Sequence, residues 1–221
     1  LEVPLATSQC AAEIARASGT RVVLNPAPAQ PLGRELLSLC DYVTPNEGEA
    51  TRLTGVDVVD DAGIRAAAEA LRGQGASAVV MTLGARGVYA LGADGELRVP
   101  AFPVSVVDTT AAGDAFSGGL AYGLARDLSL VESLRWGCAA GALACTRLGA
   151  VPSLPTHAEA AALVGTAVAV ATIVAAAVGA ATGISNTWPI CSRLGSFCRA
   201  GRVVASAAIS PVSPYGVHER L

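Results

Sequence analysis

The residues with the clearest chemical potential lie in one short run, from Asp108 to Asp114. The apolar residues 104–107 before it predict a buried strand, and residues 115–125 after it predict a helix. Small residues in between, ending at Gly113, let a ligand approach the backbone closely. The free N–H groups of a helix start attract anions, and a carboxylate beside them can accept a proton from a hydroxyl group. The run therefore predicts a turn that holds a phosphoryl group and an attacking alcohol, with Asp114 as the base.

A simpler explanation of Asp114 stays open at this point. Strands followed by a turn and a helix with an acidic first turn are common, and such a carboxylate stabilises the helix by complementing its dipole. From this run alone, Asp114 is therefore either a catalytic base or a helix-stabilising residue.

The basic residues narrow the chemistry further. All 15 basic side chains are arginines, because the chain contains no lysine. This excludes a P-loop lysine, a kinase strand lysine and a Schiff-base lysine. No Gly-x-Gly-x-x-Gly run occurs, and Gly118 is followed by Gly119 where a P-loop would need lysine. Phosphate chemistry in this chain must therefore use backbone N–H groups, helix starts, arginine or a metal.

Length and composition indicate one α/β domain, or one domain followed by a tail. Of the 221 residues, 52% are hydrophobic and 15% are charged, and the formal net charge is −3. The arginines are scattered along the chain, which argues against a nucleic-acid partner. The six cysteines form no Cys-x-x-Cys pair, so we expect no zinc site and mostly buried thiols in a reducing compartment, the cytoplasm.

Helical patterns and short apolar runs alternate along residues 1–164. Strands separated by helices favour a parallel sheet that is covered on both faces. The expected helices are 5–17, 35–40, 47–54, 60–72, 115–125, 130–147 and 156–164. The expected strands are 21–25, 42–44, 77–83 and 104–107, with a hairpin formed by 88–91 and 96–99.

The character of the sequence changes in residues 165–221. No charged residue stands between Glu159 and Arg193, and residues 163–184 are mostly alanine and valine. That stretch is long enough for a membrane span, but alanine favours insertion weakly, so we do not expect one. A packed helix is an alternative, and so is a tail that is not a selected protein sequence. Disorder is expected in residues 185–221.

Five segments resemble motifs of one protein family, in that family's order. Residues 108–120 resemble the second signature of the ribokinase family of carbohydrate kinases. The resemblance implies a ribokinase-like three-layer α/β/α fold with a mainly parallel central sheet over residues 1–164. This fold is expected to be incomplete at the N-terminus, because the family's first signature, most of its sugar pocket and its β-sheet lid have no counterpart here. The other four segments are 24–29, 44–50, 82–87 and 146–153.

The resemblance also implies a role for each matching residue. Asp114 resembles the base that activates the primary hydroxyl group of the sugar, and Gly113 resembles part of the anion hole for the γ-phosphate of ATP. Glu2 resembles a carboxylate that contacts the sugar. Asn46 and Glu49 resemble a pair that organises Mg²⁺ and phosphate through water; their spacing also suits a helix capping box, and both roles can hold.

Nucleotide contacts are implied for a larger set of residues. Residues 82–87 are also compatible with an ordinary turn at a strand end. Cys138 stands where relatives carry a more polar residue of the adenine pocket, which would loosen contacts with the base. The full set is Asn46, Thr82, Leu83, Gly84, Ala85, Gly87, Gly113, Asp114 and Cys138.

A site for a monovalent cation, expected to be K⁺, is implied near the catalytic turn. In the family its ligands are largely carbonyl oxygens, so side-chain identity matters little at several positions. The aligned residues are Asp108, Thr110, Ala144, Arg147, Gly149 and Ser153.

Together these implications point to ATP-dependent phosphorylation of D-ribose at its primary hydroxyl group, with Mg²⁺ and K⁺. The alternatives are a kinase for another sugar or a nucleoside, and a non-catalytic fragment that at most binds nucleotide or serves as an interaction module. The chain begins at Leu1, as a fragment would, and without the lid we expect poor or no activity from it alone. The family's homodimer commonly forms through that same lid.

Overall fold

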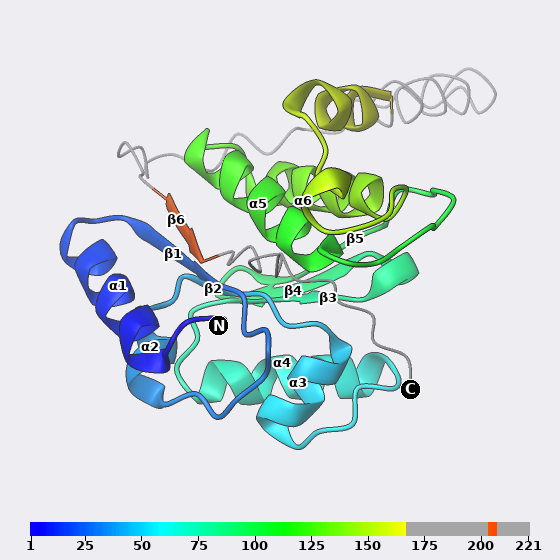
Figure 1. Ribbon diagram of the computed structural model, residues 1–221. Helices are drawn as coiled ribbons and strands as arrows, with labels where there is room; N and C mark the ends of the chain where they lie inside the picture. The colour runs from blue at the N-terminus through cyan, green and yellow to red at the C-terminus, as the bar shows by residue number, and fades with distance from the viewer. Residues whose placement is uncertain (167–202, 207–221) are drawn as a thin grey trace, which may run out of the picture.

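The computed structural model describes residues 1–166 and the backbone of residues 203–206. One sheet lies between two layers of helices, as Figure 1 shows. The first layer contains α1 (Leu5–Ala17), α2 (Arg34–Leu39), α3 (Glu47–Thr54) and α4 (Asp61–Gly73). The second layer contains α5 (Ala112–Ala125), α6 (Leu130–Ala144) and the helical residues 157–166.

The strands of the sheet follow the order β5-β4-β3-β2-β1-β6. The pairs β1–β2, β2–β3 and β1–β6 are parallel, whereas β3–β4 and β4–β5 are antiparallel. The expected α/β fold, with a mainly parallel sheet covered on both faces, is therefore confirmed, as is the predicted hairpin. The bounds are β1 Arg21–Leu24, β2 Tyr42–Val43, β3 Val79–Thr82, β4 Val88–Gly92, β5 Gly95–Val99 and β6 Val203–Ser206.

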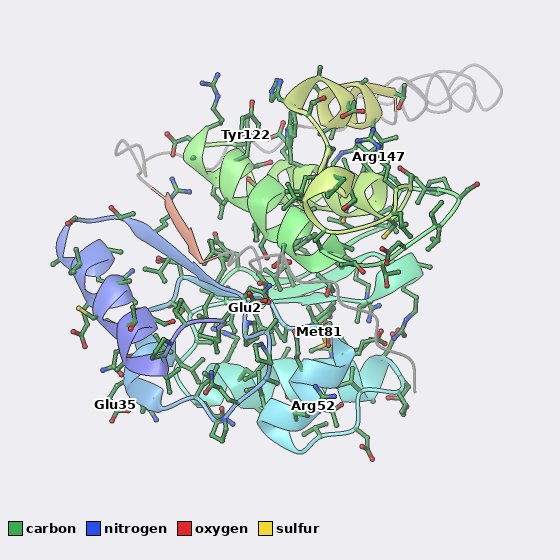
Figure 2. All side chains as sticks on the ribbon, viewed as in Figure 1. Glu2, Glu35, Arg52, Met81, Tyr122 and Arg147 are labelled. Atoms are coloured by element: carbon green, nitrogen blue, oxygen red, sulfur yellow. The ribbon has the colours of Figure 1, made fainter. Side chains whose placement is uncertain are left out.

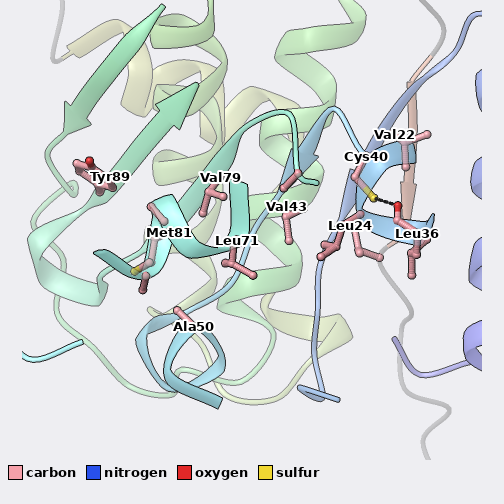
Figure 3. Close-up of a cluster of buried hydrophobic side chains, with 14 of the residues drawn as sticks. Val22, Leu24, Leu36, Cys40, Val43, Ala50, Leu71, Val79, Met81 and Tyr89 are labelled. Carbon is pink, nitrogen blue, oxygen red and sulfur yellow. Dashed lines mark hydrogen bonds between the residues drawn. The ribbon is translucent and has the colours of Figure 1, made fainter. Parts of the chain in front are cut away.

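Successive strand residues supply two separate cores. In β3, Val79 and Met81 belong to the core under α1–α4, while Val80 between them belongs to the core under α5 and α6. This follows from the strand period of two, which sends neighbouring side chains to opposite faces. Figure 3 shows the first core, where Leu71 of α4 lies among the strand side chains. Because both faces are buried, the central strands are almost continuously apolar.

Residues 104–107 do not form the predicted strand. They have no regular secondary structure, and Val106 and Val107 are 64% and 61% exposed. The N–H group of Val107 donates to the carbonyl of Cys145 at 2.8 Å, in the loop after α6. A strand depends on a ladder with a neighbouring strand, and within the described residues none lies alongside this run. The helix that follows begins at Ala112, three residues earlier than predicted.

The strand β6 lies where the sequence predicts none. Its four residues pair with β1 in parallel, with Val204 opposite Val22. The expected disorder therefore does not hold for residues 203–206, whereas the rest of the predicted tail, 167–202 and 207–221, lies outside the described residues. Among the described residues, no helix combines the length and the apolar character needed to cross a membrane. The predicted boundary between an α/β domain of residues 1–164 and a tail of residues 165–221 stays a prediction.

Candidate active site

The helix α5 begins without a side-chain cap. Its N-cap residue, Ala111, adopts the left-handed conformation with φ of 60°, and no described side chain bonds to the first backbone N–H groups. Gly113 in the first turn is exposed, and a Cβ atom built on it would meet no atom within 4 Å. The N–H group of Ala112 donates to the carbonyl of Thr109 at 3.2 Å, whereas those of Gly113 and Asp114 bond to no described residue and are open to an anion, which the helix dipole also favours.

Asp114 lies in the same turn and is half-buried. Its Oδ1 atom accepts a hydrogen bond of 3.4 Å from Nδ2 of Asn25. Burial raises the pKa of Asp114 above its ordinary value, and the negative charge of Glu2 raises it further, while the Asn25 hydrogen bond acts in the opposite direction. A carboxylate with a raised pKa beside an open helix start is well placed to accept a proton from a hydroxyl group.

Two parallel strands deliver polar side chains to α5. Asn25 follows the last residue of β1, and Thr44 follows the last residue of β2. The Oγ1 atom of Thr44 lies 3.4 Å from Oγ of Ser117, which shares a face of α5 with Asp114 because the two are three residues apart. Glu2 lies near the centre of the molecule in the view of Figure 2. The edge formed by the carboxyl ends of β1 and β2 is therefore the part of the sheet that meets Asp114.

Asn46 and Glu49 form the capping box that their spacing allows. Asn46 is the N-cap of α3, and its side chain accepts a hydrogen bond of 2.8 Å from the N–H group of Glu49. In return, Oε2 of Glu49 accepts from the N–H group of Asn46 at 2.8 Å. The structural role of this pair is confirmed, and its role with magnesium and phosphate stays a prediction. The box leaves the second carboxylate oxygen of Glu49, Oε1, unused.

The turn at residues 82–87 lies directly beside this cap. Thr82 forms a parallel bridge with Asn46, and its N–H group donates to the carbonyl of Pro45 at 2.9 Å. Gly87 has φ of 85°, and a Cβ atom there would stand 2.1 Å from the carbonyl oxygen of Val99. Only glycine fits such a position. The bridge between Thr82 and Asn46 holds this tight turn against the start of α3 at the sheet edge.

The remaining residues of this turn are arranged around a short 3₁₀ helix, Gly84–Arg86. Gly84 and Ala85 are exposed, whereas Leu83 is buried and donates its N–H group to the carbonyl of Gly87. The guanidinium group of Arg86 pairs with the carboxylate of Glu47 in α3. The exposed backbone of Gly84 and Ala85 is thus the part of this turn that a nucleotide could reach.

Asp108 holds together two loops that are distant in the sequence. Its Oδ1 atom accepts from the N–H and hydroxyl groups of Thr110 at 2.9 Å and 2.7 Å, and its Oδ2 atom accepts from the N–H group of Gly149 at 2.9 Å. The hydrogen bond from Gly149, followed by those from Thr110, lowers the pKa of Asp108 below its ordinary value. Asp108 therefore links two other residues of the predicted cation site, Thr110 and Gly149.

The other predicted cation-site residues have side chains that are buried or already paired. Ala144 is fully buried, and the Ser153 hydroxyl donates to the carbonyl of Ala150 at 2.7 Å. Arg147, labelled in Figure 2, forms an ion pair with Glu159. In the part of the chain that the structure describes, no cluster of three or more His, Cys, Asp or Glu side chains could hold a metal. The cation site in this region stays a prediction.

Cys138 is buried in the second core rather than on an open surface. It belongs to the same cluster as Phe116 and Leu134. Burial raises the pKa of its thiol to about 12, so it stays neutral at physiological pH. Any contact with a nucleotide base would have to come from the edge of this buried side chain.

A hollow of about 370 Å³ lies between α4 and the β4–β5 hairpin, away from these residues. Its charged side chains pair with one another, with Arg65 to Glu96 at 2.6 Å and Arg98 to Asp61 at 3.0 Å. None of its lining residues belongs to the predicted site.

Asn25, Thr44 and Ser117 lie in segments that resemble family motifs, 24–29, 44–50 and 108–120, but the sequence predicts no individual site role for any of the three. The signal for the first two is present, because each is a polar residue between the end of an apolar strand and a proline. Ser117 carries no such local signal, and its importance depends on a contact with a residue 73 positions away.

Comparison with known proteins agrees with this geometry. The family model described as pfkB family carbohydrate kinase matches residues 1–157. The ribokinase of Haemophilus influenzae is 46% identical over 159 residues, a match that covers 72% of this chain and 52% of that protein. The chain thus spans about half the length of the curated relatives it matches.

Solved structures give the same result. The Arabidopsis thaliana ribokinase complexed with ribose and ATP superposes with a TM-score of 0.71 at 30% identity, over 74% of this chain and 53% of that one. The phosphofructokinase-2 of Escherichia coli in complex with potassium gives a TM-score of 0.60 at 26% identity, over 74% and 53% of the two chains. With the family model matched over residues 1–157, the chain belongs to the pfkB family of carbohydrate kinases.

Proposed function

We propose that this chain contributes to the ATP-dependent phosphorylation of D-ribose at its primary hydroxyl group. The observation that carries the proposal is the first turn of α5, where exposed Gly113 adjoins a carboxylate, Asp114, with a raised pKa. The similarity to ribokinases over about half of their length supports ribose as the substrate.

In the proposed reaction, Asp114 accepts the proton of the primary hydroxyl as its oxygen attacks the γ-phosphorus atom of ATP. A bond forms between that oxygen and the phosphorus atom, and the bond from phosphorus to the β,γ-bridging oxygen breaks, so that ADP leaves. The open N–H groups around Gly113 stabilise the negative charge on the transferring group. The base must be ionised, so the rate should fall as the pH drops through the pKa of Asp114, which lies above the ordinary aspartate value.

Two ions fit the residues present. The unused Oε1 atom of Glu49 suits Mg²⁺ held through water, because this ion keeps much of its hydration shell and commonly takes one or two carboxylates. Bound Mg²⁺ would neutralise phosphate charge. The carbonyl groups of Arg147 and Gly149 accept no hydrogen bond from the described residues, which suits a K⁺ ion. The carboxylate of Asp108 would hold the surrounding loops in place.

A kinase for a different sugar is the alternative that one observation favours. The phosphofructokinase-2 structure, whose name states another substrate, also superposes on this chain. The residues described here activate a hydroxyl group and bind phosphate, and Glu2 is the one predicted contact that would discriminate between sugars. A comparison of acceptor sugars is therefore needed to identify the substrate.

The test is phosphoryl transfer by an otherwise complete enzyme that contains this chain, measured with ATP and Mg²⁺ against D-ribose, 2-deoxy-D-ribose, fructose and a nucleoside. We expect D-ribose to be the best acceptor and Asp114→Asn to lower kcat by about 10²–10⁴-fold, since general-base catalysis contributes that much. Circular dichroism of the variant controls for folding. Near-normal turnover by Asp114→Asn would remove Asp114 from the mechanism, and a preference for another acceptor would replace ribose. If the chain transfers no phosphate to any acceptor, binding of ATP with Mg²⁺ decides whether it is a nucleotide-binding chain without catalysis.

A further inference from the structure

The side chain of Asn25 is held between the sheet and the first turn of α5. Asn25 is buried, directly follows β1 and precedes Pro26, and a residue before proline is restricted to extended backbone conformations. The backbone that carries this side chain is therefore restricted by local structure. From that position, Nδ2 reaches Oδ1 of Asp114, a residue 89 positions away, at 3.4 Å.

The chemistry of the pair favours one arrangement. An ionised carboxylate only accepts hydrogen bonds, so the amide of Asn25 must present its N–H₂ group rather than its oxygen. The distance is long for such a bond, and contacts of this kind commonly tighten when substrates bind. With Oδ1 engaged by Asn25, Oδ2 is the oxygen that can take the proton of the acceptor hydroxyl group.

We propose that Asn25 is a positioning residue for the base: its side-chain amide selects the conformer of Asp114 in which the second carboxylate oxygen faces the acceptor hydroxyl group. This inference rests on the proposed function for the role of Asp114, and on geometry for the pairing itself. Asn25 acts through Asp114 and contacts neither the phosphate nor the sugar in this account.

The hydrogen bond from Asn25 also affects the pKa of Asp114. Burial and the charge of Glu2 raise the pKa of Asp114, while the Asn25 hydrogen bond lowers it. Removing the amide donor takes away a group that stabilises the ionised form, so the pKa of Asp114 must rise. The base would then be protonated, and inactive, over a wider range of pH.

The neighbouring contact of Thr44 with Ser117 supplies a matched control. Thr44 follows β2 as Asn25 follows β1, and both contacts to α5 measure 3.4 Å. Thr44→Val removes this link between the same sheet edge and the same helix face, together with the hydrogen bond of 3.4 Å from the Thr44 hydroxyl to the carbonyl of Leu24, and neither contact involves Asp114. A merely structural role for Asn25 would make the two variants equivalent.

The experiment is a ¹³C NMR titration of the Asp114 carboxyl carbon in the full chain, assigned by its loss in Asp114→Asn. We expect the midpoint to move to higher pH in Asn25→Leu and further in Asn25→Asp, which adds a negative charge, and to stay unchanged in Thr44→Val. We also expect Asn25→Leu to lower kcat by about 10- to 100-fold, as misplacement of a catalytic group does, with the KM for ATP little changed. Asn25→Asp has the shape of the native residue, so it keeps the test informative if Asn25→Leu does not fold.

The results separate this inference from the proposed function. An Asp114 midpoint that is the same in wild type, Asn25→Leu and Asn25→Asp would overturn the inference, even if Asp114→Asn abolishes transfer. An equal shift in Thr44→Val would also overturn it. If an otherwise complete enzyme that contains this chain transfers no phosphate, the proposed function fails, while the titration still decides whether Asn25 controls Asp114.

Discussion

The helices α5 and α6 are of nearly equal length, 14 and 15 residues, and they pack against each other, yet they begin differently. At the start of α6, the Ser129 side chain accepts from the N–H group of Glu132 at 3.2 Å, and the Glu132 carboxylate accepts from Ser129 in return. At the start of α5, Ala111 offers no side-chain acceptor, and its left-handed backbone is unfavourable for an alanine. Among the described residues, the third N–H group of α6, that of Glu132, therefore has a side-chain acceptor, whereas the equivalent group of α5, that of Asp114, has none.

This difference has an energetic meaning. A good N-cap stabilises a helix by about 0.5–2 kcal/mol, and a residue other than glycine in the left-handed region costs about 1–2 kcal/mol. The start of α5 lacks the stabilisation of a side-chain N-cap and has the energetic cost of a left-handed alanine. Such local costs concentrate at functional sites, where the freed backbone groups can bind a ligand. The start of α6 has no such cost and serves stability alone.

Of the three substitutions that compare helix starts, the one that blocks the open start of α5 should have the largest effect on a measured property, the affinity for ATP. Gly113→Val places a branched side chain over the first N–H groups, and we expect the affinity for ATP to fall by about 10- to 100-fold, the value of one or two charge-assisted hydrogen bonds. Gly118→Val is the matched control, because Gly118 is an equally exposed glycine of α5 on which an added Cβ atom would also meet no atom within 4 Å. Isothermal calorimetry with Mg²⁺ measures both. Equal losses in the two variants would mean that helix propensity, not phosphate binding, explains the result.

The capping boxes of α3 and α6 allow a charge to be removed without removing the cap. Glutamine can replace glutamate in such a box, so Glu49→Gln and Glu132→Gln should both change the free energy of unfolding by less than about 1 kcal/mol. We expect only Glu49→Gln to weaken the binding of ATP in the presence of Mg²⁺, by about 10-fold, the loss of one charged contact of roughly 1.4 kcal/mol. The comparison is made by calorimetry with and without Mg²⁺. An identical response of the two variants would restrict Glu49 to its capping role.

The smallest effect is expected from relieving the backbone of Ala111. Ala111→Gly removes a cost of about 1–2 kcal/mol but adds about 0.5–1 kcal/mol of chain entropy, so the net stabilisation should lie between about 0 and 1.5 kcal/mol. Differential scanning calorimetry should then show a rise in Tm of no more than about 6 °C. A clear fall in Tm would indicate that the methyl group of Ala111 makes a stabilising contact that outweighs the strain.

Most of the architecture follows from local signals in the sequence. The bounds of α1 and α3 agree with the prediction, because a proline or a capping box opens each helix and Gly19 or Gly55 follows it. The hairpin of β4 and β5 follows from a glycine-rich turn between two apolar runs. These features depend on residues that are close together in the chain.

The errors arise where distant partners decide the structure. Residues 104–107 have the composition of a strand but lack a strand beside them, whereas residues 203–206 form β6 because β1 pairs with them. The same limit applies to the site. Asp114 and Gly113 were predicted from one local run, while the contact of Asn25 with Asp114 joins two segments whose proximity no local pattern encodes.

The most direct test of the central claim compares the two helix starts in one titration. Backbone amide shifts are followed by NMR while ATP with Mg²⁺ is added to the full chain. We predict large, saturable shifts for the amides of Gly113 and Asp114, and a much smaller one for the capped amide of Glu132 in α6. Shifts that are absent at Gly113, or that are as large at α6 as at α5, would contradict the assignment of the open start of α5 as the phosphate-binding element.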